Sequence, residues 1–429
     1  MYAYRRQIVG GYCYLSIGNL NFLTSKNSFG GLLMPFSPND LSIKTTKDDD
    51  GETYTKRFFS LPVSKMIQIL DSQGHTLNAA ARDFSIEKSG DLEYAKYCTE
   101  NDFLPSPTYG EISRKFTFKS WCLAVKTYAV RFSKSKHFIL DVLKKEQRKQ
   151  LSFTRKRVID SMLYNTGFWG ISHENVDVWN VLRVVLDAFP ETQTISLDYT
   201  DLYESGYCDE VPSAEDYQVA KTIILTEGKF DAEVLSEAIT LLYPHMRKFY
   251  SFINFDEYRV QGSANFLTHY FKAFIASGIQ NRVIALYDND SAGLAEVTML
   301  KGIACPDNYR VMHLPDIELA QSYPALGPNG LEYMDINGKA VSIELYLGRD
   351  ILTEDAKLIP VQWKGLIEKT QTYQGEITKK VLVQQRYREK IKNFVSSNAE
   401  SDLWKEMRLL LMSIFSAFNY GKVQRPILS

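Results

Sequence analysis

Polar and apolar positions alternate along the N-terminal part of the chain. Residues 11–43 contain short stretches with a period of two, in which Leu15 and Ile17 alternate with tyrosine, serine and glycine, as expected for half-buried strands. Residues 44–52, which include three consecutive aspartates, are expected to form an exposed loop. Apolar residues then recur at helical spacing, and residues 112–190 are expected to be mostly helical. The pattern predicts a mixed α+β region in this part of the chain.

The pattern changes near residue 218. Short apolar runs at 221–226 and 282–287 then alternate with helical segments, and strands that alternate with helices of ~10–15 residues are typical of a parallel α/β sheet. Residues 320–338, which are rich in glycine and proline, are expected to form a loop, and the pattern from residue 361 onward is helical. We therefore expect an α+β N-terminal domain, an α/β core with a parallel sheet flanked by helices, and a helical C-terminal segment, over residues 1–218, 219–350 and 351–429.

Two of the expected strands run directly into acidic residues. The first ends at Glu227, and the second ends at Asp288 and Asp290, which are separated by one residue and can face the same side of an extended segment. Open α/β sheets bind ligands at the carboxyl ends of their strands, and Mg²⁺ or Mn²⁺ would suit such carboxylate ligands. Helix capping explains any one of these residues, but not why each interrupts an almost purely apolar strand. We therefore expect a metal site here, with general-base character at Glu227.

At these residues, the segment over 219–350 resembles the Toprim fold, which topoisomerases, bacterial primases, small RNA-maturation nucleases and overcoming-lysogenization-defect nucleases share. The family has a glutamate after its first strand and a D-x-D motif after its third, and the matching residues here are Glu227, Asp288 and Asp290. The resemblance implies a site for metal-dependent phosphoryl transfer.

The chain also resembles the nuclease branch of that family at two further positions. Asp231 lies four residues after the first glutamate, as in two-metal members, and Glu344 lies in an S-x-E context; both would be metal ligands. Lys380 is the candidate for stabilising charge on the phosphate, with Lys229 and Lys339 as further candidates. Each has an ordinary alternative: a helix-dipole carboxylate for Asp231, a surface helix residue for Glu344, and a solvated helix lysine for Lys380.

The whole chain is also similar to the bacterial family with a HEPN/Toprim-associated N-terminal domain. The similar segments are residues 16–18, 24–27, 36–40, 335–338, 360–363 and 373–376. In that family the N-terminal region is joined either to a HEPN ribonuclease or to a Toprim domain, and this chain resembles the Toprim version. The resemblance implies an effector of antiphage defence.

Composition and charge exclude only a few classes of function. Fifty basic and 51 acidic residues give a net charge of -1, which does not exclude a nuclease, because only one of its faces needs to be basic. A basic run between residues 143 and 157 is either a backbone-contacting patch or a solvated helix face. Five scattered cysteines without a CxxC pair exclude a zinc ribbon by spacing and fit a cytoplasmic location. No apolar run approaches ~18 residues, so no membrane span is expected.

We expect a metal-dependent endonuclease that acts on DNA or on RNA such as tRNA. One rival is a metal-independent HEPN-type ribonuclease, for which Arg131 and His137 have a suitable R-x(4–6)-H spacing; another is a non-catalytic sensor that binds metal or nucleic acid. A primase would need a zinc-binding segment that no Cys/His spacing supplies, and 429 residues leave little room for topoisomerase strand passage. Because no Walker A motif occurs, any ATP-driven step needs a separate trigger or ATPase partner. A homodimer is expected of such nucleases.

Overall fold

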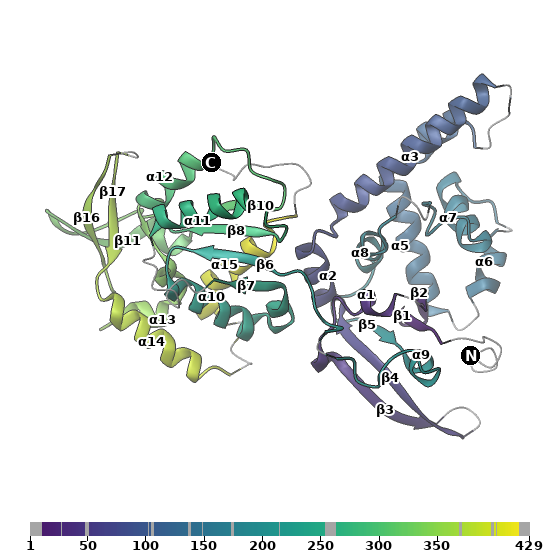
Figure 1. Ribbon diagram of the computed structural model, residues 1–429, viewed down its shortest axis with the longest axis horizontal. Coiled ribbons are helices and arrows are strands. Elements are labelled where there is room, and N and C mark those ends of the chain that lie inside the picture. Colours follow the sequence, from purple (N-terminus) through teal and green to yellow (C-terminus); the bar gives the residue numbers. More distant parts are fainter. Residues whose placement is uncertain are drawn as a thin grey trace. The chain divides into compact units, whose positions relative to one another are not determined.

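The computed structural model describes residues 11–419 except for 27, 48–50, 102, 104–106, 136–138, 148, 173–175, 214, 254–262, 369–370, 396–398 and 400. The chain forms two compact units, Met1–Gln218 and Val219–Ser429. Both units mix helices with sheets, and one sheet of the second unit is parallel (Figure 1). Among the described residues, no helix is both long and apolar enough to cross a membrane.

The first unit contains a five-stranded antiparallel sheet with the order β2-β1-β5-β4-β3. Its strands are β1 Cys13–Ile17, β2 Leu20–Ser25, β3 Leu41–Lys47, β4 Thr53–Pro62 and β5 Thr194–Asp198. Alternate residues of β1 are buried, as the period of two predicted. The loop expected at 44–52 is wrong in part, because β3 continues to Lys47 and pairs with β4 up to Thr53. Backbone pairing rather than side-chain burial holds this mostly exposed edge strand.

Helices fill the rest of the first unit, as predicted for residues 112–190. They are α1 Phe29–Leu32, α2 Val63–Ser72, α3 Leu77–Glu100, α4 Tyr109–Lys115, α5 Phe118–Lys134, α6 Ile139–Gln147, α7 Phe153–Tyr164, α8 Val178–Leu186 and α9 Thr200–Glu204, with a 3₁₀ turn at Pro38–Asp40. The start of α5 is fixed by Thr117, whose side chain accepts a hydrogen bond from the Ser120 N–H. Trp121 on α5 is fully buried and packs beside Phe84 of α3.

The second unit is built on a four-stranded parallel sheet. Its strands are β6 Thr222–Thr226, β7 Tyr250–Phe252, β8 Val283–Tyr287 and β10 Tyr309–His313, in the order β10-β8-β6-β7. Helices α11 Ala264–Ala276 and α12 Ser291–Leu300 cover one face, and α10 Lys229–Leu242 and α15 Lys405–Phe415 cover the other (Figure 1). The predicted parallel sheet with flanking helices is therefore present. Because both faces are covered, all five residues of β8 are buried, which explains its continuous apolar sequence.

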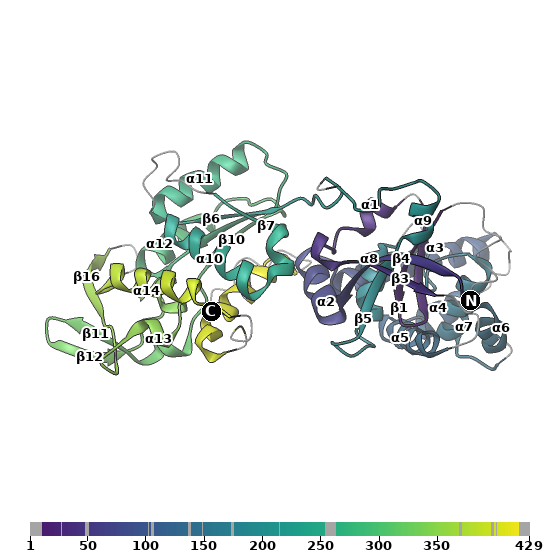
Figure 2. The same ribbon diagram turned by 90° about the horizontal axis from the view of Figure 1, so that it is seen from below.

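A second sheet of the same unit has the order β12-β11-β16-β17. Its strands are β11 Tyr323–Gly327, β12 Gly330–Met334, β16 Val361–Ile367 and β17 Thr372–Ile377. The unit also contains two short antiparallel strand pairs. They are β9 Asn289–Asp290 with β13 Ala340–Val341, and β14 Thr353–Glu354 with β15 Lys357–Leu358. The remaining helices are α13 Arg349–Leu352 and α14 Lys380–Lys392 (Figure 2). The unit also contains 3₁₀ helices at Pro244–Phe249, Glu318–Ser322, Ile343–Tyr346 and Asp402–Trp404.

Two expectations for this part of the chain are wrong. Residues 320–338 are not a loop, because their glycines and prolines mark the turn of the β11–β12 hairpin, where Gly330 has a φ of 101°. The chain is not helical from residue 361 either, since β16 and β17 precede the first helix at Lys380. Residues 351–429 therefore include strands as well as helices.

Candidate acidic site at the carboxyl ends of the parallel strands

The first two candidate carboxylates follow neighbouring strands. Glu227 follows β6 and Asp288 follows β8, and these strands pair in parallel with Thr226 opposite Leu286. The helix after β6 lies on one face of the sheet and the helix after β8 on the other (Figure 1), so the chain changes its winding direction between these strands. Open α/β sheets bind ligands at such a point. The two residues are in direct contact here, since the Asp288 N–H donates to Glu227 Oε1 over 2.9 Å.

Asp290 has the helix-capping role expected as its alternative, and Asp231 lies in the first turn of α10, as its helix-dipole alternative expects. Asp290 Oδ1 accepts a hydrogen bond from the Gly293 N–H over 2.7 Å at the start of α12, and Asp231 Oδ2 accepts one from the Gly228 N–H over 2.9 Å at the start of α10. In contrast, no described group forms a hydrogen bond with the carboxylate of Asp288, so capping does not account for this residue.

Gly293 allows α12 to begin directly against the site. A Cβ atom at this position would lie 2.3 Å from the carbonyl oxygen of Asp288 and 3.3 Å from Glu227 Oε1. Gly228 has no comparable requirement, because its φ of -137° is open to other residues. The sequence therefore needs glycine after the D-x-D motif but not after Glu227.

Glu344 is buried, so its interpretation as a surface helix residue is wrong. It is 1% exposed in the 3₁₀ helix Ile343–Tyr346. Ser342 Oγ donates to Glu344 Oε2 over 2.7 Å, and Gln384 Nε2 donates to Oε1 over 2.9 Å. The ammonium group of Lys380, at the start of α14, lies 3.4 Å from Oε1. A buried carboxylate therefore shares its environment with one of the candidate cations.

Burial and mutual repulsion raise the pKa of four of these carboxyl groups. Burial and then the charge of Asp290 raise the pKa of Glu227 to about 8, and burial and then the charge of Glu344 raise that of Asp231 to about 7. Burial, followed by the charge of Glu227, raises the pKa of Asp288 well above its usual range. Burial also raises the pKa of Asp290. We call these five residues, Glu227, Asp231, Asp288, Asp290 and Glu344, the acidic cluster.

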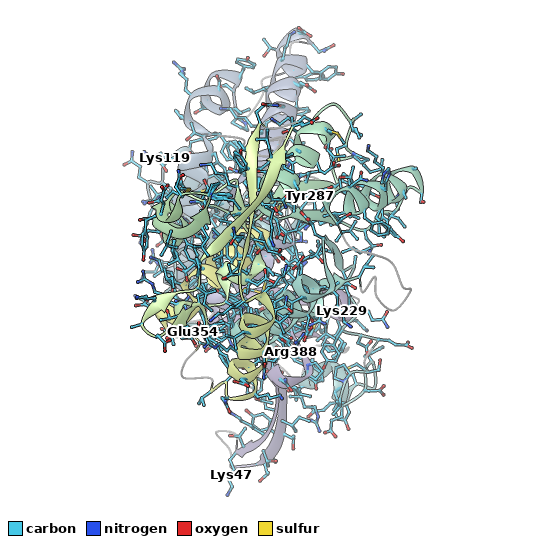
Figure 3. All side chains as sticks on the ribbon, turned by 90° about the vertical axis from the view of Figure 1, so that its left-hand side faces the viewer. Lys47, Lys119, Lys229, Tyr287, Glu354 and Arg388 are labelled. Carbon is cyan, nitrogen blue, oxygen red and sulfur yellow. The ribbon has the colours of Figure 1, made fainter. Side chains whose placement is uncertain are left out.

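Lys380 is the cation that the fold brings to the acidic cluster. Burial lowers its pKa, but the charges of Glu344 and Asp288 outweigh burial, so that the pKa of Lys380 is raised. Lys229 instead lies exposed at the start of α10 (Figure 3), and the ammonium group of Lys339 donates to the carbonyl oxygen of Asp335 over 3.1 Å. Of the three candidate lysines, Lys380 forms an ion pair with a residue of the cluster, Glu344.

The donor atoms of the cluster fit a divalent cation by their chemistry, since they are hard carboxylate oxygens. Within the described part of the chain, however, no group of three or more aspartate, glutamate, histidine or cysteine side chains is arranged as a complete metal site. The hydrogen bonds explain why suitable ligand atoms are present without a complete metal-site arrangement. Glu227, Asp231 and Asp290 each direct an oxygen at a backbone N–H group. A bound cation would have to compete with these N–H donors for the carboxylate oxygens.

Three amide side chains that support the cluster were not predicted. Gln374 Nε2 donates to Asp290 Oδ2 over 2.8 Å, and Gln384 holds Glu344, as described above. Asn289 is buried between the two aspartates of the D-x-D motif, where its amide donates to Asp316 over 2.7 Å and accepts from the Gly338 N–H over 3.0 Å. Its place inside the motif was the signal that could have identified it. The glutamines have no distinctive pattern around them.

The residues of the rival ribonuclease hypothesis lie in the first unit. Arg131 forms an ion pair with the buried Glu146 over 2.5 Å, and His137 lies outside the described residues, so this pair stays a prediction. In the basic run at 143–157, Lys144, Lys145, Lys149, Arg155 and Lys156 are exposed, although Lys149 also pairs with Glu146. Arg157 instead pairs with Glu87 and Asp91. Arg157 is therefore a structural residue, and both interpretations of the exposed lysines stay open.

Comparison with known proteins gives a match for the first unit alone. Residues 9–221, just under half of the chain, match the model of the family HEPN/Toprim N-terminal domain 1, which supports the family resemblance drawn from the N-terminal segments. No curated protein and no solved structure matches the chain. The family name points to a nuclease-related role, and in the second unit the acidic cluster is the feature that points to a function.

Proposed function

We propose that the chain is a metal-dependent nuclease whose second unit is a Toprim domain, and that it cleaves phosphodiester bonds of DNA or RNA at the acidic cluster. The observation that carries the proposal is the position of Glu227 and Asp288 together, at the point of the parallel sheet where ligands bind. Carboxyl groups with raised pKa values cluster at functional sites, because burying like charges side by side has no structural benefit.

The acidic cluster supplies the ligands in this proposal. Asp288, Glu227 and Asp290 would hold Mg²⁺ or Mn²⁺, and Asp231 and Glu344 would complete the coordination. When bound, such an ion neutralises charge on the scissile phosphate and lowers the pKa of a bound water. The Asp288 carboxylate is the most available of these groups, because the described residues leave it without a hydrogen-bond donor.

The remaining polar groups of the site orient the reacting ones. The Lys380 ammonium group, 3.4 Å from Glu344, would stabilise negative charge that develops on the phosphate. Gln374 and Gln384 fix the orientation of Asp290 and Glu344 through their hydrogen bonds, and Glu227 serves as general base. In the proposed biological setting, the enzyme is a cytoplasmic effector of bacterial antiphage defence, a homodimer that is triggered by a separate protein such as an ATPase.

A cleavage assay with the full chain tests this proposal. The substrates are plasmid DNA, single-stranded DNA and total tRNA, each with Mg²⁺, Mn²⁺ or EDTA. We expect metal-dependent cleavage that is lost in Asp288→Asn and kept in the matched control Glu318→Gln, whose side chain is 77% exposed and pairs with Lys405. RNA cleavage that survives both EDTA and Asp288→Asn would refute the proposal in favour of the pair Arg131 and His137.

Metal binding provides a second test that does not depend on a trigger or on the correct substrate. A ligand that binds the folded state alone raises the unfolding temperature. Mn²⁺ should therefore stabilise the unmodified chain and Glu318→Gln, but not Asp288→Asn. If Mn²⁺ leaves the unfolding temperature of the unmodified chain unchanged, the acidic cluster is not a metal site.

A further inference from the structure

The second sheet of this unit carries a cleft of about 430 Å³ beside the acidic cluster, within the usual size range of ligand pockets. Its lining is mainly apolar and includes Gly327, Pro328, Met334, Trp363, Thr372 and Tyr373. The strand register places Trp363 and Tyr373 on one face with Ala325 and Glu332, since Ala325 pairs with both Glu332 and Val361, and Trp363 pairs with Gly375. The cleft is therefore a feature of the sheet face rather than of a loose loop.

The aromatic wall of the cleft depends on two glycines. A Cβ atom at Gly375 would lie 3.1 Å from the indole ring of Trp363, and one at Gly327 would lie 3.3 Å from it. Without these side chains, the indole lies directly on the sheet and stays half-buried. Tyr373 is 60% exposed at the same cleft. No described group forms a hydrogen bond with the indole N–H of Trp363 or with the hydroxyl of Tyr373.

Strand β17 lies between the cleft and the acidic cluster. Tyr373 lines the cleft, and the next residue, Gln374, donates to Asp290 Oδ2 over 2.8 Å. Ser291 donates to the carbonyl oxygen of Tyr373 over 3.0 Å and accepts a hydrogen bond from Thr372 over 2.8 Å. A molecule bound at the cluster would therefore extend past β17 to reach the cleft.

We propose that this cleft binds an unpaired nucleobase, and hence that the nucleic acid cut at the acidic cluster is single-stranded beside the scissile phosphate. This inference rests on the proposed nuclease function and adds the substrate class to it. Bases stack on exposed aromatic side chains irrespective of sequence, and a base inside a duplex cannot reach such a surface. Lys339 at the wall of the cleft supplies a positive charge for the phosphate, and Glu332 supplies an acceptor for an exocyclic amino group.

The test measures binding rather than cleavage, in EDTA, by fluorescence anisotropy of labelled 12-nucleotide DNA and RNA and of the duplexes with the same sequences. We expect the single strands to bind more tightly than the duplexes. Tyr373→Ala and Trp363→Leu should each weaken single-strand binding by about tenfold, in line with the loss of one base–aromatic stack, and Trp363→Phe should restore most of it. Leucine keeps an apolar side chain against Gly327 and Gly375, so a loss of binding in Trp363→Leu reports the missing indole ring rather than a loss of packing.

The matched control is Tyr333→Ala. Tyr333 is 64% exposed on the same sheet, but it pairs with Pro324 and so lies on the opposite face from the cleft. Its loss should leave binding unchanged. Equal binding of single strands by the unmodified chain and Tyr373→Ala, or equal binding of single strands and duplexes, would overturn the inference. Asp288→Asn should still bind single strands, so a failure of the nuclease proposal and a failure of this inference give different results.

Discussion

Buried charges are arranged in opposite ways in the two units. In the first unit they are matched: the buried Glu87 pairs with Arg157, and Arg183 pairs with both Asp71 and Asp187. In the second unit, five carboxylates form the acidic cluster, and the described residues supply one ion pair to it, from Lys380 to Glu344. Matched pairs satisfy each other within the fold, whereas an excess of buried charge of one sign lowers stability unless a ligand compensates for it. The comparison separates charges that hold the structure together from charges that are available for binding.

The largest expected effect comes from breaking a matched group in the first unit. Arg157→Met leaves Glu87 and Asp91 without their guanidinium partner, and removal of one partner from a buried ion pair typically costs about 3–5 kcal/mol. Removal of a charge from the acidic cluster should have the opposite sign. In EDTA, Asp288→Asn should raise the unfolding temperature of its unit by at least about 2 °C.

Hydrogen exchange of peptides from each unit distinguishes these changes from global effects. Arg157→Met should lower protection in the first unit, and Asp288→Asn should raise it in the second. If Asp288→Asn destabilises the protein in EDTA as strongly as Arg157→Met does, the acidic cluster is a structural element like the matched pairs.

The next effect is an opposite response of the two units to acid. Burial would raise the pKa of Asp187, but Lys126 and Arg183 outweigh burial and lower it. Its stabilising contribution is therefore present above the unfolded pKa of about 3.9 and is lost as the pH falls through the lower folded value. In the second unit the pKa of Glu227 is raised to about 8 and that of Asp231 to about 7. The folded state therefore binds protons that the unfolded chain does not bind, and stability increases as the pH falls from about 8 to about 5.

Peptide-level hydrogen exchange at several pH values measures how the stability of each unit changes with pH. EDTA is present, and the data are corrected for the intrinsic exchange rates. Between pH 8 and pH 5 the second unit should gain protection, while the first should keep it until more acidic pH. Saturating Mn²⁺ should abolish the gain in the second unit, since the bound ion compensates the same charges. Parallel slopes in the two units would show that the excess of carboxylates does not govern stability.

A smaller effect is expected where the backbone approaches the cluster. In Gly293→Ala the new methyl group would lie 2.3 Å from the carbonyl oxygen of Asp288, so that α12 must move away, at a cost of about 1–3 kcal/mol. The matched control is Gly302→Ala, where the added atom meets nothing within 4 Å. Thermal unfolding should separate the two variants, and Mn²⁺ should stabilise the control alone. Equal stability of both variants would mean that α12 accommodates the methyl group without disturbing the site.

The sequence predicts the parts of the molecule where one physical signal dominates. Buried parallel strands are continuously apolar and end at turn residues, so β6 and β8, and with them Glu227 and Asp288, could be located directly. Strands β16 and β17 were missed, because much of their surface is exposed and burial leaves no clear period in their sequence. Glu344 entered through family resemblance, and Lys380 entered as one of three lysines whose charge could stabilise the phosphate, rather than through any local pattern.

The support of the site was not predictable for a different reason. Gln374 lies 84 residues from Asp290 in sequence and meets it only in the folded chain. A glutamine on a strand is compatible with solvent exposure, with pairing to a neighbouring strand or with contact to a distant carboxylate, and the sequence does not distinguish these. Glu227 and Asp288 could be identified because carboxylates at the ends of buried apolar strands are unfavourable, whereas the amides that orient the cluster carry no such signal.

The smallest expected effect concerns one of these amides. Gln374→Leu removes the donor to Asp290 but leaves the Gly293 N–H in place, so the stability of the unit should change by about 1 kcal/mol. Mn²⁺ affinity should fall by about 10-fold to 100-fold, because groups that orient metal ligands affect binding more than folding. Gln362→Leu on the neighbouring strand removes a long hydrogen bond of 3.4 Å to the Leu326 carbonyl and serves as the control. Thermal unfolding of each variant at increasing Mn²⁺ concentrations measures both the stability of the unit and its Mn²⁺ affinity. Equal Mn²⁺ affinities of the two variants would show that Gln374 has only a structural role. It would then stabilise the fold without contributing to binding, as the matched charges of the first unit do.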